Sequence, residues 1–309
     1  MPALRVSLRQ LQVFAAVART GSTAAASVAV ALSQSATSSA VNELERLLDV
    51  RLFDRAGKRL LLNDLGRVVL RRALSVLDGA AGVEQLAREG GSQLQALRIG
   101  ASTTIGSYVL PKLLASYFAA ESGPDSGAWQ SRVSIANTAE ICSAVARFEL
   151  DVGIIEGPNH EPELKVEPWL NDEMTIVAAA DDPISRRDEV VSGRALRTAT
   201  WLLREPGSGT RAFTDQMVLP LLHSYRRSIE LGSSEAIKRA AAEGLGVACL
   251  SHWVVADMVH AGHLRLLRTR IQQRIRRCYI VRHHAKEMTP ALQALLSVLT
   301  AAKEVGRSV

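Results

Sequence analysis

Residues 204–211 read REPGSGTR and combine a glycine-rich turn with hydroxyl side chains and two arginines. Glycine allows a backbone to approach a ligand closely, and Ser208 and Thr210 add hydroxyl donors. A helix that follows such a turn directs its unpaired backbone N–H groups toward whatever lies before it, which suits an anion. An ordinary turn in which Ser208 or Thr210 caps the next helix explains the same residues.

Two known motifs with similar residues do not fit this stretch. A nucleotide-binding P-loop needs a lysine directly after its last glycine, but Thr210 follows Gly209 here. The stretch also lacks the G-x-S-x-G turn that carries the nucleophile of α/β-hydrolases. Neither motif therefore explains this stretch, and both an anion site and an ordinary capped turn stay open.

Short polar side chains recur at three other places where a strand-like segment gives way to a helical one. These are Ser102, Thr103 and Thr104 in ASTTIGSY, Asn137 and Thr138 in SIANTAEI, and Ser233 and Ser234 in LGSSEAIK. A helix cap accounts for each junction by itself. Because ligands of α/β sheets lie at the carboxyl ends of strands, the four junctions together favour one shared polar pocket.

Metal binding and catalysis find little support. His260 and His263 flank Gly262 with no evident third ligand, and His283 and His284 would point to opposite faces of a strand end. No Ser/His/Asp or Cys/His arrangement is recognisable. We therefore expect no metal, no cofactor and no enzyme activity.

The whole chain has the composition of a globular protein, and its positive charge permits an acidic partner. Its 309 residues suffice for two or three compact units, and its net charge of +6 permits nucleic acid, anionic lipid or an acidic metabolite. The three cysteines, Cys142, Cys249 and Cys278, form no C-x-x-C pair, which argues against a disulfide framework or a zinc site. No apolar run approaches 18 residues free of charge, so we expect a cytoplasmic protein without a membrane partner.

The first 65 residues predict three short helices followed by a hairpin. Ser7 and Gln10 form a capping box for the first helix, Gly21 ends it, Ser22 caps an alanine-rich second helix, and Ser33 caps a third. The second helix is expected to span residues 23–31. Two helices joined by a tight turn after a first helix form a helix-turn-helix.

The third helix and the hairpin carry the candidate DNA contacts. The exposed start of the helix has short polar side chains that reach base edges when it enters a major groove, namely Gln34, Ser35, Thr37, Ser38 and Ser39. Gly57 marks the hairpin turn, and the cations beside it are positioned to touch the DNA backbone, namely Arg55, Lys58 and Arg59. A solvated helix face and a basic hairpin that serves solubility are the alternatives, but the order of the elements favours DNA binding.

Residues 8–66 resemble the N-terminal winged helix-turn-helix of the LysR-type transcriptional regulators. The resemblance rests on LRQLQVFAAVARTGS and on LSQSATSSAVNELERLLDVRLFDRAGKRLLLNDLG. The chain departs from the family pattern at Thr23, at residues 35–37 and at Asn63, which changes the bases that could be read. Promoter DNA is the partner that this resemblance implies.

Residues 64–89 predict one long helix with an apolar stripe, because Leu65, Val69, Ala73, Val76 and other apolar residues recur every three or four positions. Such a helix spans roughly 35–40 Å. It either packs on its own domain or pairs with a second copy, and the resemblance implies a dimerisation helix that ends near Gly90-Gly91-Ser92.

The remaining two thirds read as an α/β fold. Helical patterns separate most of eight strand-like segments, which favours a mainly parallel sheet of buried strands, at residues 97–102, 131–138, 150–157, 173–180, 199–205, 227–233, 246–251 and 277–283. GASTTIG, ELDVGIIEG, REPGSGTR and SSEAIKRAAAEGLGVACLS resemble the two-lobed effector domain of LysR-type regulators, which is similar to periplasmic solute-binding proteins. They are closest to the branch that regulates sulfur assimilation and carbon fixation genes.

This resemblance implies which residues face an effector. The TTIG and EPGSGTR segments line the cleft of that branch, which implies contacts from Ser102, Thr103, Thr104, Ser208, Gly209 and Thr210, with Asn137 beside them. Arg204 and Arg211 either supply charge or pair with acidic residues on the lobe surface. The expected lobes are residues 92–167 with 269–309, and residues 168–268.

The sequence thus predicts a winged helix-turn-helix over residues 1–65, a linker helix over 66–91 and a two-lobed α/β effector domain over 92–309. The expected partners are double-stranded promoter DNA, a small anionic effector and further copies in a homodimer or homotetramer, with contact to RNA polymerase left open. The effector would be a sulfur oxyanion, phosphate or a small phosphorylated or carboxylated metabolite. The alternatives are a regulator that responds to no ligand or to a protein, and a solute-binding protein.

Overall fold

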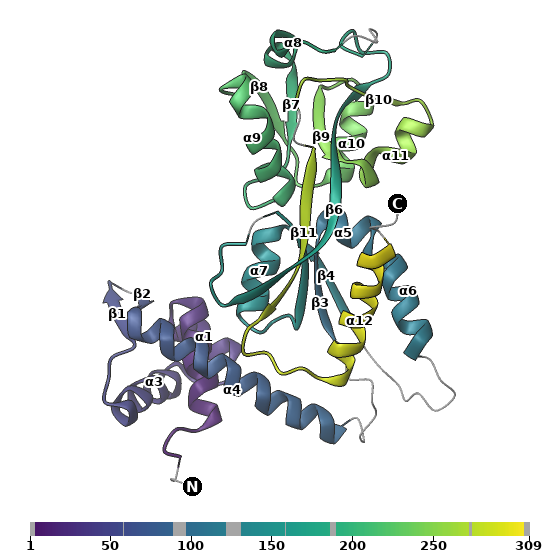
Figure 1. Ribbon diagram of the computed structural model, residues 1–309. Helices are drawn as coiled ribbons and strands as arrows, with labels where there is room; N and C mark the ends of the chain where they lie inside the picture. Colours follow the sequence, from purple (N-terminus) through teal and green to yellow (C-terminus); the bar gives the residue numbers. More distant parts are fainter. Residues whose placement is uncertain are drawn as a thin grey trace. The chain divides into compact units, whose positions relative to one another are not determined.

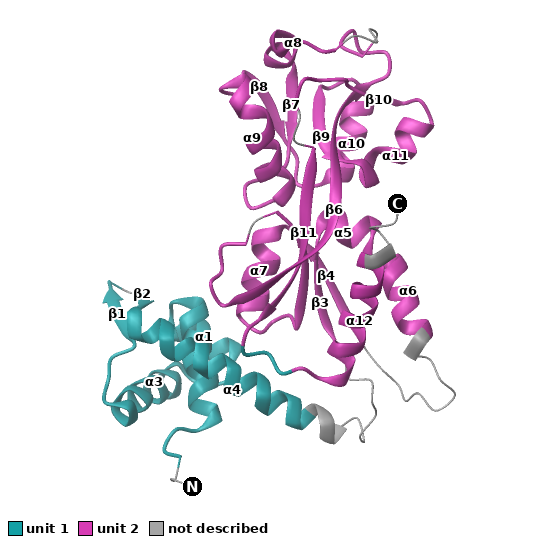
Figure 2. Ribbon diagram, viewed as in Figure 1, with its two compact units in different colours: residues 1–92, 285–287 teal, residues 93–284, 288–309 magenta. Residues whose placement is uncertain are grey.

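The computed structural model describes residues 4–57, 59–88, 97–121, 131–157, 159–185, 190–271 and 274–305. The chain divides into two compact units, which we treat separately (Figure 2). The first contains residues 1–92 and 285–287, and the second contains residues 93–284 and 288–309.

The first unit contains the predicted helices and hairpin. Its elements are α1 (Leu8–Thr20), α2 (Thr23–Ala29), α3 (Gln34–Leu48), β1 (Phe53–Ala56), β2 (Arg59–Leu62) and α4 (Asp64–Arg88). The Ser7–Gln10 capping box is confirmed, as are the caps Ser22 and Ser33, and Gly21 ends α1 with φ 66°. The second helix ends earlier than predicted, because Ala31 adopts a positive φ that no helix continues through.

Aromatic and aliphatic side chains join the elements of this unit into one core. Phe14 and Phe53 meet edge to face with ring centroids 5.5 Å apart, and Leu44 and Leu52 are fully buried beside them. A Cβ on Gly66 would lie 2.1 Å from the Leu52 carbonyl oxygen, so only glycine permits α4 to start this close to the hairpin.

The predicted long helix is confirmed as α4, which has 25 residues. Ala73 of α4 is buried in the core of this unit. Three valines of α4 are exposed, with exposed fractions of 46% for Val68, 50% for Val76 and 68% for Val83. The predicted stop at Gly90-Gly91-Ser92 lies outside the described residues. The described part of α4 therefore packs on its own unit along one face and exposes apolar side chains on another.

The second unit is built on a nine-stranded sheet (Figure 1). Its strands are β3 (Arg98–Ser102), β4 (Arg132–Ala136), β5 (Val152–Glu156), β6 (Leu164–Ala179), β7 (Thr200–Leu203), β8 (Arg227–Glu230), β9 (Val247–Ser251), β10 (Leu264–Leu266) and β11 (Ile275–His283). The order is β4-β3-β5-β11-β6-β9-β7-β8, and β10 pairs with β6. Figure 1 shows β6 and β11 running from one group of strands and helices into the other, which makes the unit two-lobed.

The prediction of a mainly parallel sheet is wrong. Parallel pairs join β3 to β4 and β5, and β7 to β8 and β9, but β11 and β6 pair antiparallel with every neighbour described. The prediction placed a strand only at residues 173–180. The strand β6 is longer, with 16 residues that begin at Leu164 and continue through Pro168, and its additional residues pair antiparallel with β11. The predictions of buried strands at residues 131–138 and 227–233 are also wrong, since β4 and β8 are edge strands without buried residues.

Helices follow most of these strands and cover the sheet. They are α5 (Thr103–Tyr108), α6 (Leu110–Glu121), α7 (Thr138–Ala146), α8 (Gly193–Thr198), α9 (Gly209–Leu222), α10 (Ser234–Ala242), α11 (His252–His260) and α12 (Pro290–Val305). One core forms between β3, β5, α6 and α12, and another surrounds Trp201 between β7, α9 and β9. None of the described helices is long and apolar enough to span a bilayer.

Candidate functional site

The starts of α5, α7, α9 and α10 are linked to one another by hydrogen bonds. The Arg204 guanidinium donates to the hydroxyl of Thr103 at 3.2 Å and to that of Ser234 at 3.1 Å. The Ala139 backbone N–H donates to the Gly207 carbonyl at 3.1 Å, which connects α7 to the turn before α9. The four hydroxyl-rich junctions singled out in the sequence therefore lie together in the second unit.

Gly209 allows the closest of these approaches. A Cβ on Gly209 would lie 1.8 Å from the carbonyl oxygen of Glu156, at the end of β5. The Thr138 hydroxyl donates to the same carbonyl at 2.8 Å. The first turn of α9 consequently rests directly on the carboxyl end of β5.

A buried group of charged side chains lies beneath these helix starts. Arg276 on β11 pairs with Asp172 on β6 through its Nε, at 3.1 Å, and through its Nη2. Its Nη1 donates to the Thr210 hydroxyl at 2.9 Å and lies 3.9 Å from Glu156 Oε1. Asp172 also accepts a 2.6 Å hydrogen bond from the Ser251 hydroxyl. Two carboxylates thus share one guanidinium in this interior.

Glu156 is the least well compensated member of this group. Its Oε1 accepts from the Thr104 backbone N–H at 3.4 Å, whereas its Oε2 and the Thr104 hydroxyl are buried without a hydrogen-bond partner among the described residues. Burial raises the pKa of Glu156 above its ordinary value, against the opposing charge of Arg276. A protonated Glu156 offers an O–H donor beside the Thr104 hydroxyl.

The predicted effector residues fall into two groups. Thr103, Thr104 and Thr210 contact Arg204, Glu156 and Arg276. The others are caps or supports: Asn137 caps α7, Ser208 caps α9, and the Ser102 hydroxyl bridges the β5 backbone at Ile154 and Glu156. Asn137 and Ser208 therefore serve as the helix caps that the simpler interpretation expects, whereas the Ser102 side chain makes no cap hydrogen bond and Gly209 packs on the Glu156 carbonyl.

The sequence interpretation missed Glu156, Asp172 and Arg276. Asp172 and Arg276 lie one residue before the strand segments predicted from residues 173 and 277, and Glu156 lies inside a segment read as a buried strand. A charged residue within or beside a buried strand was the available signal, because such a group needs a partner or a ligand.

A hollow of about 370 Å³ opens between the starts of α7 and α9. Ser208 and Gly209 line it together with Thr138, Asn159, His160 and Arg211. Arg211 pairs with Asp215 at 2.9 Å, so its charge is already balanced there. The hydroxyls of Thr138 and Ser208 are already used within the fold, and the acidic residues Glu161 and Asp215 also line the hollow.

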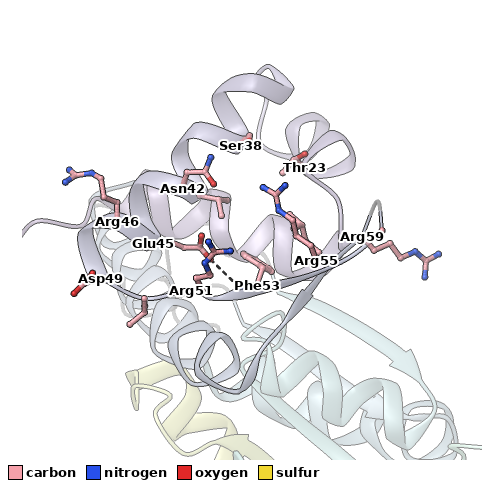
Figure 3. Close-up of a pocket in the computed structure, with 14 residues that line it drawn as sticks. Thr23, Ser38, Asn42, Glu45, Arg46, Asp49, Arg51, Phe53, Arg55 and Arg59 are labelled. Atoms are coloured by element: carbon pink, nitrogen blue, oxygen red, sulfur yellow. Dashed lines mark hydrogen bonds between the residues drawn. The ribbon is translucent and has the colours of Figure 1, made fainter.

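The first unit has its own hollow of about 690 Å³, between α3 and the β1–β2 hairpin (Figure 3). Three of the predicted DNA contacts line this hollow, namely Ser38, Arg55 and Arg59. Figure 3 shows Arg55 pointing into it. Asn42 and Arg51 line it as well and were missed by the sequence interpretation. Lys58 lies outside the described residues.

The start of α3 agrees only in part with the predicted DNA contacts. Gln34, Ser35 and Ser39 are exposed, but Thr37 is fully buried and its hydroxyl donates to the Ser33 carbonyl at 3.0 Å. Thr37 therefore cannot reach a base edge, because its position in the helix turns it toward the core. Glu45 fixes the hairpin by accepting from the Leu52 backbone N–H at 2.6 Å.

A helix-turn-helix with a basic hairpin and a separate two-lobed α/β unit define the class of DNA-binding regulators with an effector-binding domain. Residues 8–67 match the family described as bacterial regulatory helix-turn-helix protein, lysR family, and residues 90–304 match the LysR substrate binding domain. The chain belongs to the LysR family of transcriptional regulators.

One sequence relative and two solved structures are similar to this chain. The chain is 43% identical to an Escherichia coli K12 protein described as an uncharacterized HTH-type transcriptional regulator, YeiE, over 95% of this chain and 97% of that protein. It is similar to a full-length OxyR variant from Pseudomonas aeruginosa, with a TM-score of 0.67, 24% identity and coverage of 96% and 95% of the two chains. The CcmR regulatory domain of Synechocystis PCC6803, solved in complex with 2-PG, matches with a TM-score of 0.60, 27% identity and coverage of 68% and 98%. The matching full-length relative is named a transcriptional regulator and not an enzyme.

Proposed function

We propose that this regulator responds to a small anion held at the starts of α5 and α9. A single observation carries the proposal: the Thr104 hydroxyl and Glu156 Oε2 are both buried, and by distance and angle neither has a hydrogen-bond partner among the described residues, although the Thr104 side chain helps to lower the pKa of Glu156. Buried polar atoms of this kind cost stability unless something satisfies them. An anion between them would accept from the hydroxyl and from a protonated Glu156.

The charge balance favours an anion that binds together with a proton. As long as both carboxyl groups are ionised, the two negative charges of Glu156 and Asp172 exceed the single positive charge of Arg276. Protonation of Glu156, which burial favours, removes one negative charge and supplies a donor. The proposed site consists of Thr103, Thr104, Ser208, Gly209 and Thr210, with Ser102 and Asn137 holding its walls.

Sulfite, sulfate, phosphate and small phosphorylated or carboxylated metabolites have the chemistry that such donors recognise. The CcmR regulatory domain, whose structure contains 2-PG, supports a small phosphorylated metabolite as one candidate class. Closure of the lobes around the anion would alter the DNA-binding units only if the anion binds two arrangements of the protein unequally.

For the DNA complex, we propose that α3 enters the major groove and that the hairpin touches the backbone. The proposed contacts are Gln34, Ser35, Ser38, Ser39, Arg55, Lys58 and Arg59, to which the hollow in Figure 3 adds Asn42 and Arg51. Exposed valines on α4 support pairing of two chains along this helix, in a dimer or a dimer of dimers. The domain boundaries at residues 65 and 91, and the division of the lobes at residues 167 and 268, remain part of this proposal, as does contact with RNA polymerase.

A thermal-shift titration of the full chain tests the anion site. Sulfite, sulfate, thiosulfate, phosphate and 2-PG are titrated in turn, and an anion that binds only the folded state raises the melting temperature with ln(1 + [L]/Kd). Thr104→Val should abolish the rise, because it removes a hydroxyl that holds no partner among the described residues, so folding suffers little. Thr300→Val, an exposed threonine on α12, is the matched control.

A saturable rise that survives Thr104→Val would place the anion elsewhere. No rise with any of these anions would remove the small-anion proposal and favour control without a ligand or by a protein partner. A solute-binding protein, the remaining alternative, gains no support beside the LysR family assignment.

A further inference from the structure

A second groove of about 980 Å³ lies at the middle of β6, and none of the proposed effector residues lines it. Five elements of the second unit surround it, and they are α6, β6, α11, β11 and α12. Its lining residues are Lys112, Leu113, Ser116, Pro168, Trp169, Leu170, Asn171, Trp253, Arg277, Cys278, Val298, Ala301, Ala302 and Lys303.

A β-bulge builds this groove. Arg277 pairs with Asn171 and Tyr279 pairs with Pro168, so two residues of β6 oppose the single residue Cys278. Successive residues of a regular strand face opposite sides of a sheet, yet residues 168–171 all line the groove. Bulges redirect side chains and occur often beside functional sites.

Aromatic and aliphatic side chains form part of the groove wall, beside the polar Ser116 and Asn171. Trp169 is 5% exposed, and its Nε1 donates to the Leu299 carbonyl at 2.7 Å, so its ring presents only an apolar surface. Trp253 and Val298 are half-buried against the same core. An apolar ligand body would therefore contact aromatic and aliphatic side chains whose polar atom is already satisfied.

The charged groups of the groove are all cations. Lys112 and Arg277 are exposed at its edge, and the ammonium group of Lys303 donates to the Pro168 carbonyl at 2.8 Å. No aspartate or glutamate occurs among the residues that line it. This excess of positive charge over apolar walls matches an anion with an apolar body.

We infer that the groove is a second ligand site, for a monocarboxylate with an aromatic ring or a medium-length acyl chain. The carboxylate lies between Lys112, Arg277 and Lys303, and the apolar part lies against Trp169 and Trp253. The site is independent of the anion site at α5 and α9, and its volume falls in the range of small-molecule pockets.

Isothermal titration calorimetry of the full chain tests this site with phenylacetate, indole-3-acetate and decanoate. The corresponding alcohols are the uncharged controls. The double variant Lys112→Gln/Arg277→Gln should weaken carboxylate binding by up to roughly tenfold, since each exposed charge contributes modestly. Arg132→Gln removes an exposed cation of the same unit outside the groove and should leave the affinity unchanged.

Saturable binding of a carboxylate that weakens in the double variant and persists in Thr104→Val supports the inference. Equal binding of acids and alcohols overturns it, as does the absence of binding by all three acids. If Thr104→Val loses carboxylate binding while the double variant keeps it, the ligand belongs to the anion site. This result also overturns the inference. A change of oligomer mass in the double variant, measured by analytical ultracentrifugation, would make the groove a contact between copies and contradict the inference.

Discussion

The Arg276 guanidinium on β11 donates a 2.9 Å hydrogen bond to the Thr210 hydroxyl in the first turn of α9. The same guanidinium pairs with Asp172 on β6, so one side chain connects the two long strands with the start of a helix. Both Arg276 and Asp172 are 1% exposed. The geometry of the proposed anion site therefore depends on a cation that does not itself reach the solvent.

Arg276→Gln should destabilise the protein by about 3–5 kcal/mol, because it leaves the buried Asp172 without its counterion. Urea denaturation followed by circular dichroism measures this loss. Arg282→Gln is the control, since Arg282 belongs to the same strand and pairs with the more exposed Glu167. Equal losses in the two variants would contradict the role given to Arg276.

Glu156→Gln should flatten the dependence of stability on pH. Burial raises the pKa of Glu156 above its ordinary value of 4.5, so the folded state holds this proton more tightly than the unfolded state. The stabilisation from this proton is complete at a pH below the pKa of Glu156 in the unfolded chain. It is lost as the pH rises toward the higher pKa of Glu156 in the folded protein. As the pH rises from about 5 to 8, the melting temperature of Glu156→Gln should thus fall less than that of the wild-type protein.

The same substitution provides a test of protonation during anion binding. If the anion accepts from a protonated Glu156, its affinity for the unchanged chain should decrease as the pH rises, and this decrease should be smaller in Glu156→Gln. Glu173→Gln replaces an exposed glutamate of β6 and is the matched control. Identical pH profiles for the unchanged chain and Glu156→Gln would refute the proposed role of Glu156.

Gly209→Ala should destabilise the second unit by on the order of 3 kcal/mol, because its Cβ would lie 1.8 Å from a backbone oxygen. Relief of this contact moves α9 away from β5, so the anion response should be lost as well. Gly232→Ala, where a Cβ meets nothing within 4 Å, should cost far less. Chemical denaturation of both variants makes the comparison.

Arg59→Ala should lower the slope of log affinity against log salt concentration for DNA by about one, since one phosphate contact is removed. Sequence preference should change little. Arg147→Ala is the control, because Arg147 belongs to the second unit and pairs with Glu149 there. An unchanged slope in Arg59→Ala would remove this residue from the backbone contacts.

Val76→Glu should weaken self-association if α4 pairs two chains, because a charge would enter an apolar contact. Sedimentation velocity over a range of concentrations measures the change in mass. Val28→Glu on α2, at an even more exposed valine, should leave the mass unchanged. The same oligomer in both variants would show that this face of α4 is not the interface.

The sequence alone determined the local elements and the family. Caps at Ser7, Ser22 and Ser33 and the stop at Gly21 are signals read within one turn of a helix, so they needed no distant contact. The hydroxyl-rich junctions also belong to such local signals. They predicted that the starts of α5, α7, α9 and α10 would gather, because the ends of neighbouring strands share an edge.

Only the tertiary structure decided which charged groups meet. Arg276 lies more than 100 residues after Glu156 and Asp172, and the antiparallel pairing of β11 with β5 and β6 brings the three side chains together. Burial of Thr37 was equally undetermined, since a threonine at the start of a helix suits either face. Local patterns specify helices and caps, whereas strand pairing and burial depend on the whole chain, and these decided the chemistry of both sites.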